Sequence, residues 1–384
     1  MSVSVLKPGL LTTVQDRGRR GYAALGVGVA GPMDDVAFRL ANALVGNGDD
    51  AAALEMTIIG PRLRFDAAAT IALTGAGFAA HIDGSAIENW RAIDISAGAV
   101  LACGRARRGA RGYLAVAGGF TVEPVLGSAA TDVNARLGPF GGRALAMHDT
   151  LWFSEGALQA RPGQLSVGAL QARPGRRYEN LVAAAPLLQN PSANLVAAAP
   201  LLQNPSASLI AAAPRVPFRV LLQNPSASAW SLDPRPWFDP DPHRPIRLIR
   251  GSHFDALDQA SREALFTAQF RIAADSNRVG FRLDGRHLAF AGPLELVSEP
   301  VGFGTVQLPH GGQPIALMAE HPTTGGYPRI GQIAAIDLSR LAQRRPGDPV
   351  RFVEIDLDQA QTRYLARERE LARLLDAIAM RLAT

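Results

Sequence analysis

The chain has 384 residues, of which 47% are hydrophobic and 19% charged. This length suits two domains better than one, and this composition excludes a globally disordered chain. No apolar run reaches the roughly 18 residues that a membrane helix needs. Residues 1–9 lack the basic and apolar parts of a secretion signal, so we expect a cytoplasmic protein with no membrane partner. The single cysteine, Cys103, excludes an internal disulfide and a thiolate zinc site.

The positive charge is not the footprint of a nucleic-acid-binding protein. The formal net charge is +5, but Lys7 is the only lysine, so nearly all of this charge is arginine, which is typical of codon bias in a GC-rich genome. The densest arginine cluster, residues 105–111, alternates with glycine and has only Tyr113 as a neighbouring aromatic platform. We therefore expect no nucleic-acid partner.

Residues 1–153 predict short strands and one good helix. Short apolar or alternating runs are broken by glycine, proline or aspartate, and they occupy residues 3–9, 13–18, 62–76, 78–84, 98–104, 111–119 and 149–153. The predicted helix covers residues 32–46, with Pro32 at its first position and acidic residues in its first turn. Gly46 is expected to end this helix.

The character of the sequence changes between residues 154 and 240. The sequence GALQARPG occurs at 156–163 and 168–175, and NLVAAAPLLQNPSA occurs without change at 180–193 and 194–207. These periods are shorter than any solenoid repeat, and the prolines recur too often for long helices. The segment is predicted to be an Ala/Pro-rich insertion, either a flexible linker or a functional module.

The folded pattern resumes at Ile246. Residues 246–251 predict a strand and residues 255–270 a helix, and strands are expected up to residue 355, including residues 332–338. Residues 357–384 predict an amphipathic helix with Leu371, Leu375, Ile378 and Leu382 on one face. The sequence therefore predicts a mainly β protein with a few helices, divided into a lobe at 1–153, the insertion at 154–240, a lobe at 241–355 and a C-terminal helix at 356–384.

The sequence predicts neither a dinucleotide-binding site nor a metal site. GVGVAG at residues 26–31 matches a dinucleotide fingerprint, but no apolar strand precedes it and Pro32 removes an amide where a pyrophosphate would bind. The histidines show no HExxH motif and no helical i, i+4 pair, so no metal site is predicted. His310 and His321 flank a strand and are either pocket residues or ordinary isolated histidines.

Three polar clusters stand out from ordinary strand ends. Residues 13–22 place Gln15, Asp16, Arg17 and Arg19 around one turn, and residues 320–331 combine hydroxyls with bare glycine amides that suit an anion or a carbonyl. Asn277 and Arg278 form the third cluster. Since loops from two lobes gather at the cleft between them, we expect the three clusters to converge there; three unrelated turns are the alternative.

A series of blocks in chain order carries a resemblance to a known family. The blocks are residues 12–22, 31–47, 53–61, 72–77, 111–120, 125–132, 276–285, 306–318 and 323–331. They resemble the carboxyltransferase C/D family, which includes the C subunit of bacterial 5-oxoprolinase, the protein called allophanate hydrolase subunit 2 and the matching part of urea carboxylase. The resemblance implies cyclophilin-like β-barrels in two lobes. At residues 320–322, the family usually has an acidic residue and a variable pair before TTGGYP; here these are Glu320, His321 and Pro322.

The resemblance implies one subunit of an enzyme that opens 5-oxo-L-proline to L-glutamate with ATP, together with A and B subunits. Two alternatives remain: a carboxyltransferase subunit of a biotin-dependent urea- or allophanate-type enzyme, or a non-catalytic antagonist of a kinase inhibitor. The sequence has no P-loop, so the ATP site on this chain is unknown. Lys7 is the only lysine and the sequence has no Met-Lys-Met, so this chain is not expected to be biotinylated. In the biotin-dependent alternative, the biotin would be carried by another chain.

The resemblance also implies the residues of the site. Asp34 or Glu320 is expected to be the catalytic base, and Arg17 or Arg278 is expected to hold a substrate carboxylate. The amides of residues 323–326 are expected to stabilise an oxyanion. The full expected substrate-binding set is Gln15, Asp16, Arg17, Asn277, Arg278, Gln307, His310, Thr323, Thr324, Gly325, Gly326 and Tyr327.

Overall fold

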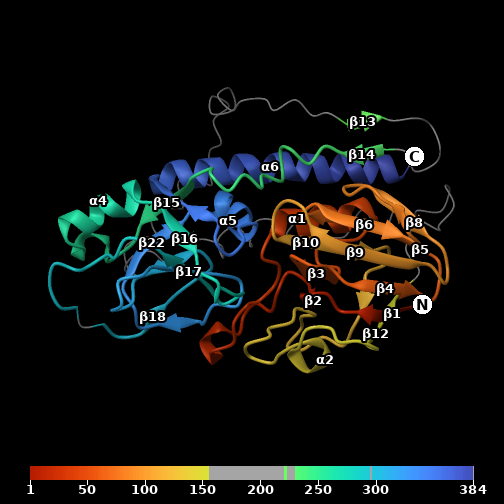
Figure 1. Cartoon of the computed structure of the whole chain (residues 1–384), viewed down its shortest axis with the longest axis horizontal. Helices are drawn as coiled ribbons and strands as arrows, with labels where there is room; N and C mark the ends of the chain where they lie inside the picture. The colour runs from red at the N-terminus through yellow and green to blue at the C-terminus, as the bar shows by residue number, and fades with distance from the viewer. Residues whose placement is uncertain (155–219, 223–229, 295, 384) are drawn as a thin grey trace, which may run out of the picture.

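The computed structural model describes residues 1–154, 220–222, 230–294 and 296–383. Two β-rich lobes lie side by side, and a long C-terminal helix, α6 (Leu357–Leu382), crosses over both of them (Figure 1). The mainly β, two-lobed architecture with an amphipathic C-terminal helix confirms the predicted fold class.

The N-terminal lobe consists of two sheets with its core between them. Strands of the seven-stranded sheet alternate between buried and more exposed residues, as in β4, where Leu63 and Phe65 face the core while Arg62 and Arg64 face solvent. In the five-stranded sheet, β3 and β10 are buried at every residue. The seven-stranded sheet has the order β11 (Phe120–Thr121), β12 (Thr150–Phe153), β1 (Ser2–Lys7), β4 (Arg62–Phe65), β9 (Val100–Ala106), β6 (Phe78–Ile82) and β7 (Ser85–Ala86). The five-stranded sheet has the order β2 (Leu11–Gln15), β3 (Ala53–Thr57), β10 (Arg111–Val116), β5 (Ala69–Gly75) and β8 (Ala92–Ile95).

The C-terminal lobe is built on one eight-stranded sheet. Its apolar core also receives Met33 from the N-terminal lobe, so the two cores are joined by a buried side chain. The strand order is β23 (Pro349–Val350), β16 (Phe270–Ile272), β17 (Gly280–Asp284), β20 (Ile315–Leu317), β19 (Thr305–Gln307), β22 (Arg329–Ile333), β15 (Ile246–Arg250) and β24 (Phe352–Glu354). A separate ribbon pairs β18 (Glu299–Pro300) with β21 (Thr324–Gly325), and the short helices η6 (Phe254–Ala256) and α4 (Gln259–Thr267) complete the lobe.

The first long helix, α1 (Asp35–Leu44), begins later than the sequence predicts. Pro32 lies outside it, because the carboxylate of Asp34 accepts a hydrogen bond from the Ala37 amide at 3.1 Å and so caps the helix. Gly46 follows its end with a φ of +75°, the left-handed conformation that suits glycine. The first loop also contains η1 (Ala23–Leu25), and α2 (Pro139–Gly142) precedes β12.

The prediction of a strand at residues 332–338 is wrong for most of its length. Strand β22 ends at Ile333, and helix α5 (Ala335–Ala342) starts at once. The run of Ile, Ala, Ala and Ile is too short for its period to distinguish strand from helix. Burial of Asp337 and Leu341 on one side of α5 then favours the helix.

The segment predicted as an insertion is described only at its end. Strand β13 (Val220–Leu222) pairs in antiparallel fashion with β14 (Trp230–Leu232), and the Leu232 amide donates to the Trp90 carbonyl at 2.8 Å. Trp230, Trp237 and Phe238 pack against the cluster that includes α1 and α6. The repeats themselves lie outside the described residues.

Helix α6 packs against the N-terminal lobe through a buried apolar face. Leu371, Leu374 and Ile378 are buried against α1, and two further leucines of the predicted face, Leu375 and Leu382, are partly buried there. Among the described residues, the structure has no helix that is both long and apolar enough to cross a membrane.

Replacing Leu371 by Ala should lower the free energy of unfolding by about 2–5 kcal/mol, because it leaves a cavity in this cluster. Leu365→Ala on the same helix is the control, since Leu365 is 37% exposed and its loss should cost less than about 1 kcal/mol. Urea denaturation measures both. Equal losses for the two variants would show that α6 does not anchor the lobes through this face.

Candidate functional site

A buried arginine connects the two lobes. Arg278 of the C-terminal lobe is 3% exposed, and its Nε lies 2.5 Å from Oε1 of Glu320. Its Nη1 binds Glu55 on β3 of the N-terminal lobe, and its Nη2 donates to the Gly31 carbonyl at 2.7 Å. Two carboxylates and a carbonyl thus surround the guanidinium, which makes the burial of its charge tolerable.

The N-terminal side of this network includes Glu55, Tyr113, Asp34 and Gln343. Oε2 of Glu55 accepts from the Tyr113 hydroxyl at 2.7 Å and from the Met33 amide at 2.8 Å. The Tyr113 oxygen in turn accepts from the Asp34 amide at 2.8 Å, and Nε2 of Gln343 donates to the Asp34 carboxylate at 2.7 Å. Helix α1, strands β3 and β10 and the end of α5 are therefore held by one continuous set of hydrogen bonds.

Burial changes the ionisation of two members of this network. Desolvation raises the pKa of the Asp34 carboxyl above its ordinary value, although hydrogen bonds from Gln343 and Ala37 oppose the change. Desolvation, together with the neighbouring Glu55 carboxylate, raises the pKa of the Tyr113 hydroxyl as well. Tyr113 is thus a hydrogen-bond donor, whereas Asp34 is an acid with a perturbed pKa, a property common at functional sites.

The first predicted cluster packs against residues 128–131. Gln15 at the end of β2 donates through Nε2 to the Thr131 carbonyl at 2.9 Å. The Asp16 carboxylate accepts from the Ser128 hydroxyl and from the Ala129 amide, both at 2.6 Å. Asp16 therefore holds the loop in place, while Gln15 keeps its Oε1 buried without a hydrogen-bond partner.

Arg19, beside these residues, carries unsatisfied donors. It is 1% exposed, and its Nη2 donates to the Ala130 carbonyl, but its Nε and Nη1 have no partner. In the part of the chain that the structure describes, no other guanidinium has two such buried nitrogens, and Oγ1 of Thr131 is unsatisfied beside it. Burial lowers the pKa of Arg19, whereas the nearby carboxylates of Asp132, Asp16 and Glu320 oppose this change. Such a site can bind an anion or a small polar molecule.

Glu320 lies between the hydrogen-bond network of Arg278 and the residues around Arg19. One of its oxygens binds Arg278, and the other has only a long contact, 3.4 Å, to the Asn134 amide. Its carboxylate also acts electrostatically on Arg19. Of the two predicted catalytic acids, Glu320 is therefore the one that contacts Arg278 and also lies near the unpaired nitrogens of Arg19.

The TTGGY segment belongs to a different local structure. Thr324 and Gly325 form β21, which pairs with β18, and the Thr323 carbonyl accepts from the Val301 amide at 3.1 Å. Nε2 of Gln307 donates to the Tyr327 carbonyl at 3.3 Å. The hydrogen bonds of this segment therefore go to nearby residues of the same lobe, and Gly326 and Tyr327 are exposed.

The other predicted residues lie outside both groups. Arg17 is partly exposed, with contacts of 3.8 Å to Asp35 and to Asp49. The carbonyl oxygen of the Asn277 side chain accepts from the Val279 amide at 2.8 Å, and His310 is exposed in a turn. Convergence of all three clusters on one pocket remains a prediction.

The glycine loop at residues 26–31 does not fit a nucleotide phosphate. A side chain at Gly28 would meet the His321 carbonyl at 3.2 Å and the Asp132 carboxylate at 3.6 Å, so electronegative atoms already face this loop. In the described parts of the chain, no group of three or more His, Cys, Asp or Glu side chains is arranged to hold a metal. Cys103 is buried, which raises the pKa of its thiol to about 12 and makes it unreactive.

Sequence reasoning missed Glu55, Tyr113 and Gln343. A usable signal existed for Glu55, because a carboxylate inside the apolar run ALEMT must find a partner when the strand is buried. Gln343 gives no such signal, since it only follows the end of a helix. Arg19 stood in the predicted turn, but its burial follows from tertiary packing.

Arg278→Met should lower the free energy of unfolding by about 3–5 kcal/mol, because Glu55 and Glu320 would keep buried carboxylates without their counter-ion. Arg282→Met is the control, since Arg282 pairs with Asp275 at 3.0 Å in an exposed position and should cost less than about 1 kcal/mol. Chemical denaturation measures both. An unchanged stability of Arg278→Met would contradict its role as the connection between the lobes.

The raised pKa of Asp34 gives a pH dependence with a definite sign. The folded protein binds the proton more tightly than the unfolded chain, so Asp34 favours folding at low pH and this contribution is lost as the pH rises. Asp34→Asn removes the titration while keeping a helix-capping residue. The stability of the variant relative to the natural chain should therefore increase as the pH rises above about 4, the ordinary pKa of an aspartate. A difference that stays constant as the pH is raised from there, measured by denaturation at each pH, would refute the assignment.

The comparisons with known proteins agree with this architecture. The family "carboxyltransferase domain, subdomain A and B" matches residues 25–199 and 209–354, which confirms the predicted carboxyltransferase family. The C subunit of the Escherichia coli 5-oxoprolinase is 32% identical over 381 residues, covering 99% of this chain and 98% of that protein. The C subunit of the Haemophilus influenzae 5-oxoprolinase is 28% identical and covers 93% of each chain.

A solved structure extends the likeness to larger enzymes. The Kluyveromyces lactis urea amidolyase superposes with a TM-score of 0.74 and 25% identity over 98% of this chain. This chain corresponds to 20% of that protein. With a family match over most of its length and a relative that is similar from end to end, the chain belongs to the carboxyltransferase domain family, subdomains A and B.

Proposed function

We propose that the chain is the C subunit of a 5-oxoprolinase, an enzyme that opens 5-oxo-L-proline to L-glutamate with ATP. The observation that carries this proposal is the 32% identity to the C subunit of the Escherichia coli enzyme over nearly the full length of both proteins. The large urea amidolyases match as well, but this chain corresponds to a small part of them.

The substrate carboxylate binds Arg19 rather than Arg278 in this proposal. Arg278 already has Glu55, Glu320 and the Gly31 carbonyl around its guanidinium, whereas two nitrogens of Arg19 lack a partner. A planar guanidinium with two free donors suits a carboxylate. Gln15 supports the same placement, because its buried Oε1 can accept a hydrogen bond from the lactam N–H.

Access to this place requires a movement of the adjoining loop. Arg19 is almost fully buried, but residues 20–26 are largely exposed and Leu25 is 77% exposed. Few buried contacts hold this loop, so its displacement costs little free energy compared with opening the core. In the proposal, residues 20–26 move aside to admit the substrate to Arg19.

Glu320 is the preferred acid–base residue. Its Oε2 has only the long contact to Asn134 and therefore retains lone pairs for a proton, and its other oxygen is held by Arg278. The Asp34 carboxylate is occupied by the α1 amide and Gln343, so we assign it to the positioning of α1. Of the predicted oxyanion donors at residues 323–326, we keep the amide of the exposed residue Gly326, and Gln307 holds its loop through the Tyr327 carbonyl.

Partner subunits are part of the proposal. The described residues do not fit ATP at the glycine loop, so we assign no step with ATP to this chain and expect the nucleotide on an A or B subunit. A biotin-dependent urea-type carboxyltransferase is the second candidate, supported by the TM-score of 0.74 to the Kluyveromyces lactis enzyme. In that case the biotin would be carried by another chain.

Reconstitution distinguishes these functions. We expect the purified chain to release no glutamate from 5-oxo-L-proline with ATP, and the mixture with A and B subunits to release it. Urea offered with a biotin carboxylase, carboxybiotin and ATP should remain uncarboxylated. Urea carboxylation would favour the second candidate, and turnover of oxoproline by the single chain would contradict the requirement for partners.

Arg19→Met should lower kcat/KM of the reconstituted enzyme by roughly ten- to a hundredfold, because a charged hydrogen bond to the substrate contributes about 1.5–3 kcal/mol. It should not lower the free energy of unfolding, since it removes a buried charge with unsatisfied donors. Arg20→Met, at the exposed neighbouring position, is the matched control and should leave both quantities unchanged. A stable, fully active Arg19→Met enzyme would refute the placement of the carboxylate.

A further inference from the structure

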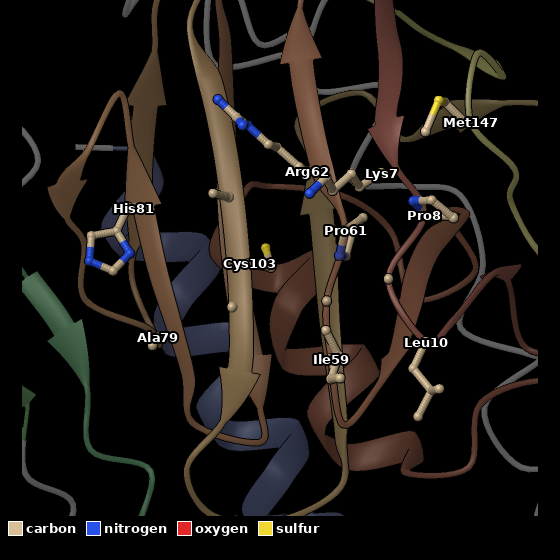
Figure 2. Close-up of a pocket in the computed structure, with 14 residues that line it drawn as sticks. Lys7, Pro8, Leu10, Ile59, Pro61, Arg62, Ala79, His81, Cys103 and Met147 are labelled. Carbon is tan, nitrogen blue, oxygen red and sulfur yellow. The ribbon is translucent and has the colours of Figure 1, made fainter.

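The solvent face of the seven-stranded sheet has a hollow of about 690 Å³. Figure 2 shows it over β4, β9 and β6, with the Cys103 sulfur behind β9 on the core side. Three of the residues of β6 and β9 that line it, Ala79, Ala102 and Gly104, have small or no side chains, while His81 of β6 and Arg62 of β4 are longer.

Exposed apolar side chains line the hollow. Leu10 is 60% exposed, Met147 53% and Ile59 39%, and Pro8 and Pro61 line the hollow with them. These side chains give the hollow a partly apolar lining. Figure 2 shows Leu10 at the opposite end of the hollow from Lys7 and Arg62.

Strand register sets a row of basic residues across the hollow. Lys7 of β1 is paired with Arg62 of β4, Arg62 with Ala102 of β9, and Ala102 with His81 of β6. Paired residues on neighbouring strands are about 5 Å apart, so Lys7 lies beside Arg62, and Arg62 and His81 lie on either side of Ala102. Like charges directly opposite each other, as at Lys7 and Arg62, are destabilising without a counter-ion.

The structure supplies no counter-ion of its own at this row. The lining of the hollow contains no Asp or Glu, and among the described residues neither Lys7 nor Arg62 has a hydrogen bond or ion pair. Arg64, two residues further along β4 on the same face, contrasts with them, because its Nε binds Asp66 at 3.1 Å. Lys7 and Arg62 therefore lie opposite each other, with no acidic side chain in the lining of the hollow to pair them.

We propose that this hollow binds a small organic anion with an apolar body, its carboxylate at Lys7 and Arg62 and its hydrocarbon against Leu10, Ile59 and Met147. Charge complementarity selects the anionic end, and the exposed apolar side chains select the rest of the molecule. The volume lies within the roughly 300–1,000 Å³ usual for small-molecule sites. The proposal is independent of the proposed function.

Octanoate is the probe, and octanamide, which has the same chain without the charge, is its matched control. Isothermal titration of the full chain should detect octanoate binding up to about fivefold tighter than octanamide binding, since one exposed ion pair contributes up to about 1 kcal/mol. Lys7→Gln and Arg62→Gln should each weaken octanoate binding by about the same factor. Arg64→Gln should leave it unchanged, because Arg64 is already paired.

The unique lysine gives a second readout. An amine-reactive reagent can label only Lys7 among the side chains, and octanoate but not octanamide should slow this labelling, followed by mass spectrometry. Equal affinity for the two probes, no octanoate binding, or binding that survives both Lys7→Gln and Arg62→Gln would each overturn the proposal. Lys7 labelling that only a protein partner slows, with no effect of octanoate, would show a docking surface instead and would also overturn it.

Discussion

The Arg278 guanidinium holds the two lobes in their relative position. It comes from the C-terminal lobe and binds Glu55 of the N-terminal sheet and Glu320 of its own lobe. A buried charge of this kind is costly if any partner is removed, so the lobes must meet in a way that satisfies it. Met33, inserted into the C-terminal core from the opposite lobe, adds an apolar contact at the same junction.

The need to pair buried polar groups also explains why Asp34, Tyr113 and Gln343 lie at the junction of the two lobes. Each polar group that enters a low-dielectric region needs a partner, and each partner brings its own strand or helix into a defined position. Tyr113 joins β10 to β3 and to the start of α1, while Gln343 joins α5 to α1. Helix α6 then covers the junction with Leu371, Leu374 and Ile378.

Satisfied and unsatisfied charges have different meanings in this molecule. Arg278 is fully paired and therefore acts as a structural connection, whereas Arg19 keeps two buried nitrogens without partners. An apolar residue in place of Arg19 would avoid this cost, so the presence of the guanidinium favours a ligand. On the solvent face of the seven-stranded sheet, the side chains of Lys7 and Arg62 also have no ion-pair partner among the described residues, but they are in contact with water.

Local sequence was enough to predict the period-2 strands, the end of α1 near Gly46, the amphipathic α6 and the family blocks, because these depend on neighbours within a few residues. It also pointed to Arg278 and Glu320 as unusual residues. It was not enough to predict the length of the strand at residues 332–338, because short apolar runs fit two periods. The pairing of Arg278 with Glu55, 223 residues away, and the burial of Arg19 without partners became visible only in the folded chain. Those outcomes depend on which distant strands meet, and that is a property of the packed lobes rather than of any local segment.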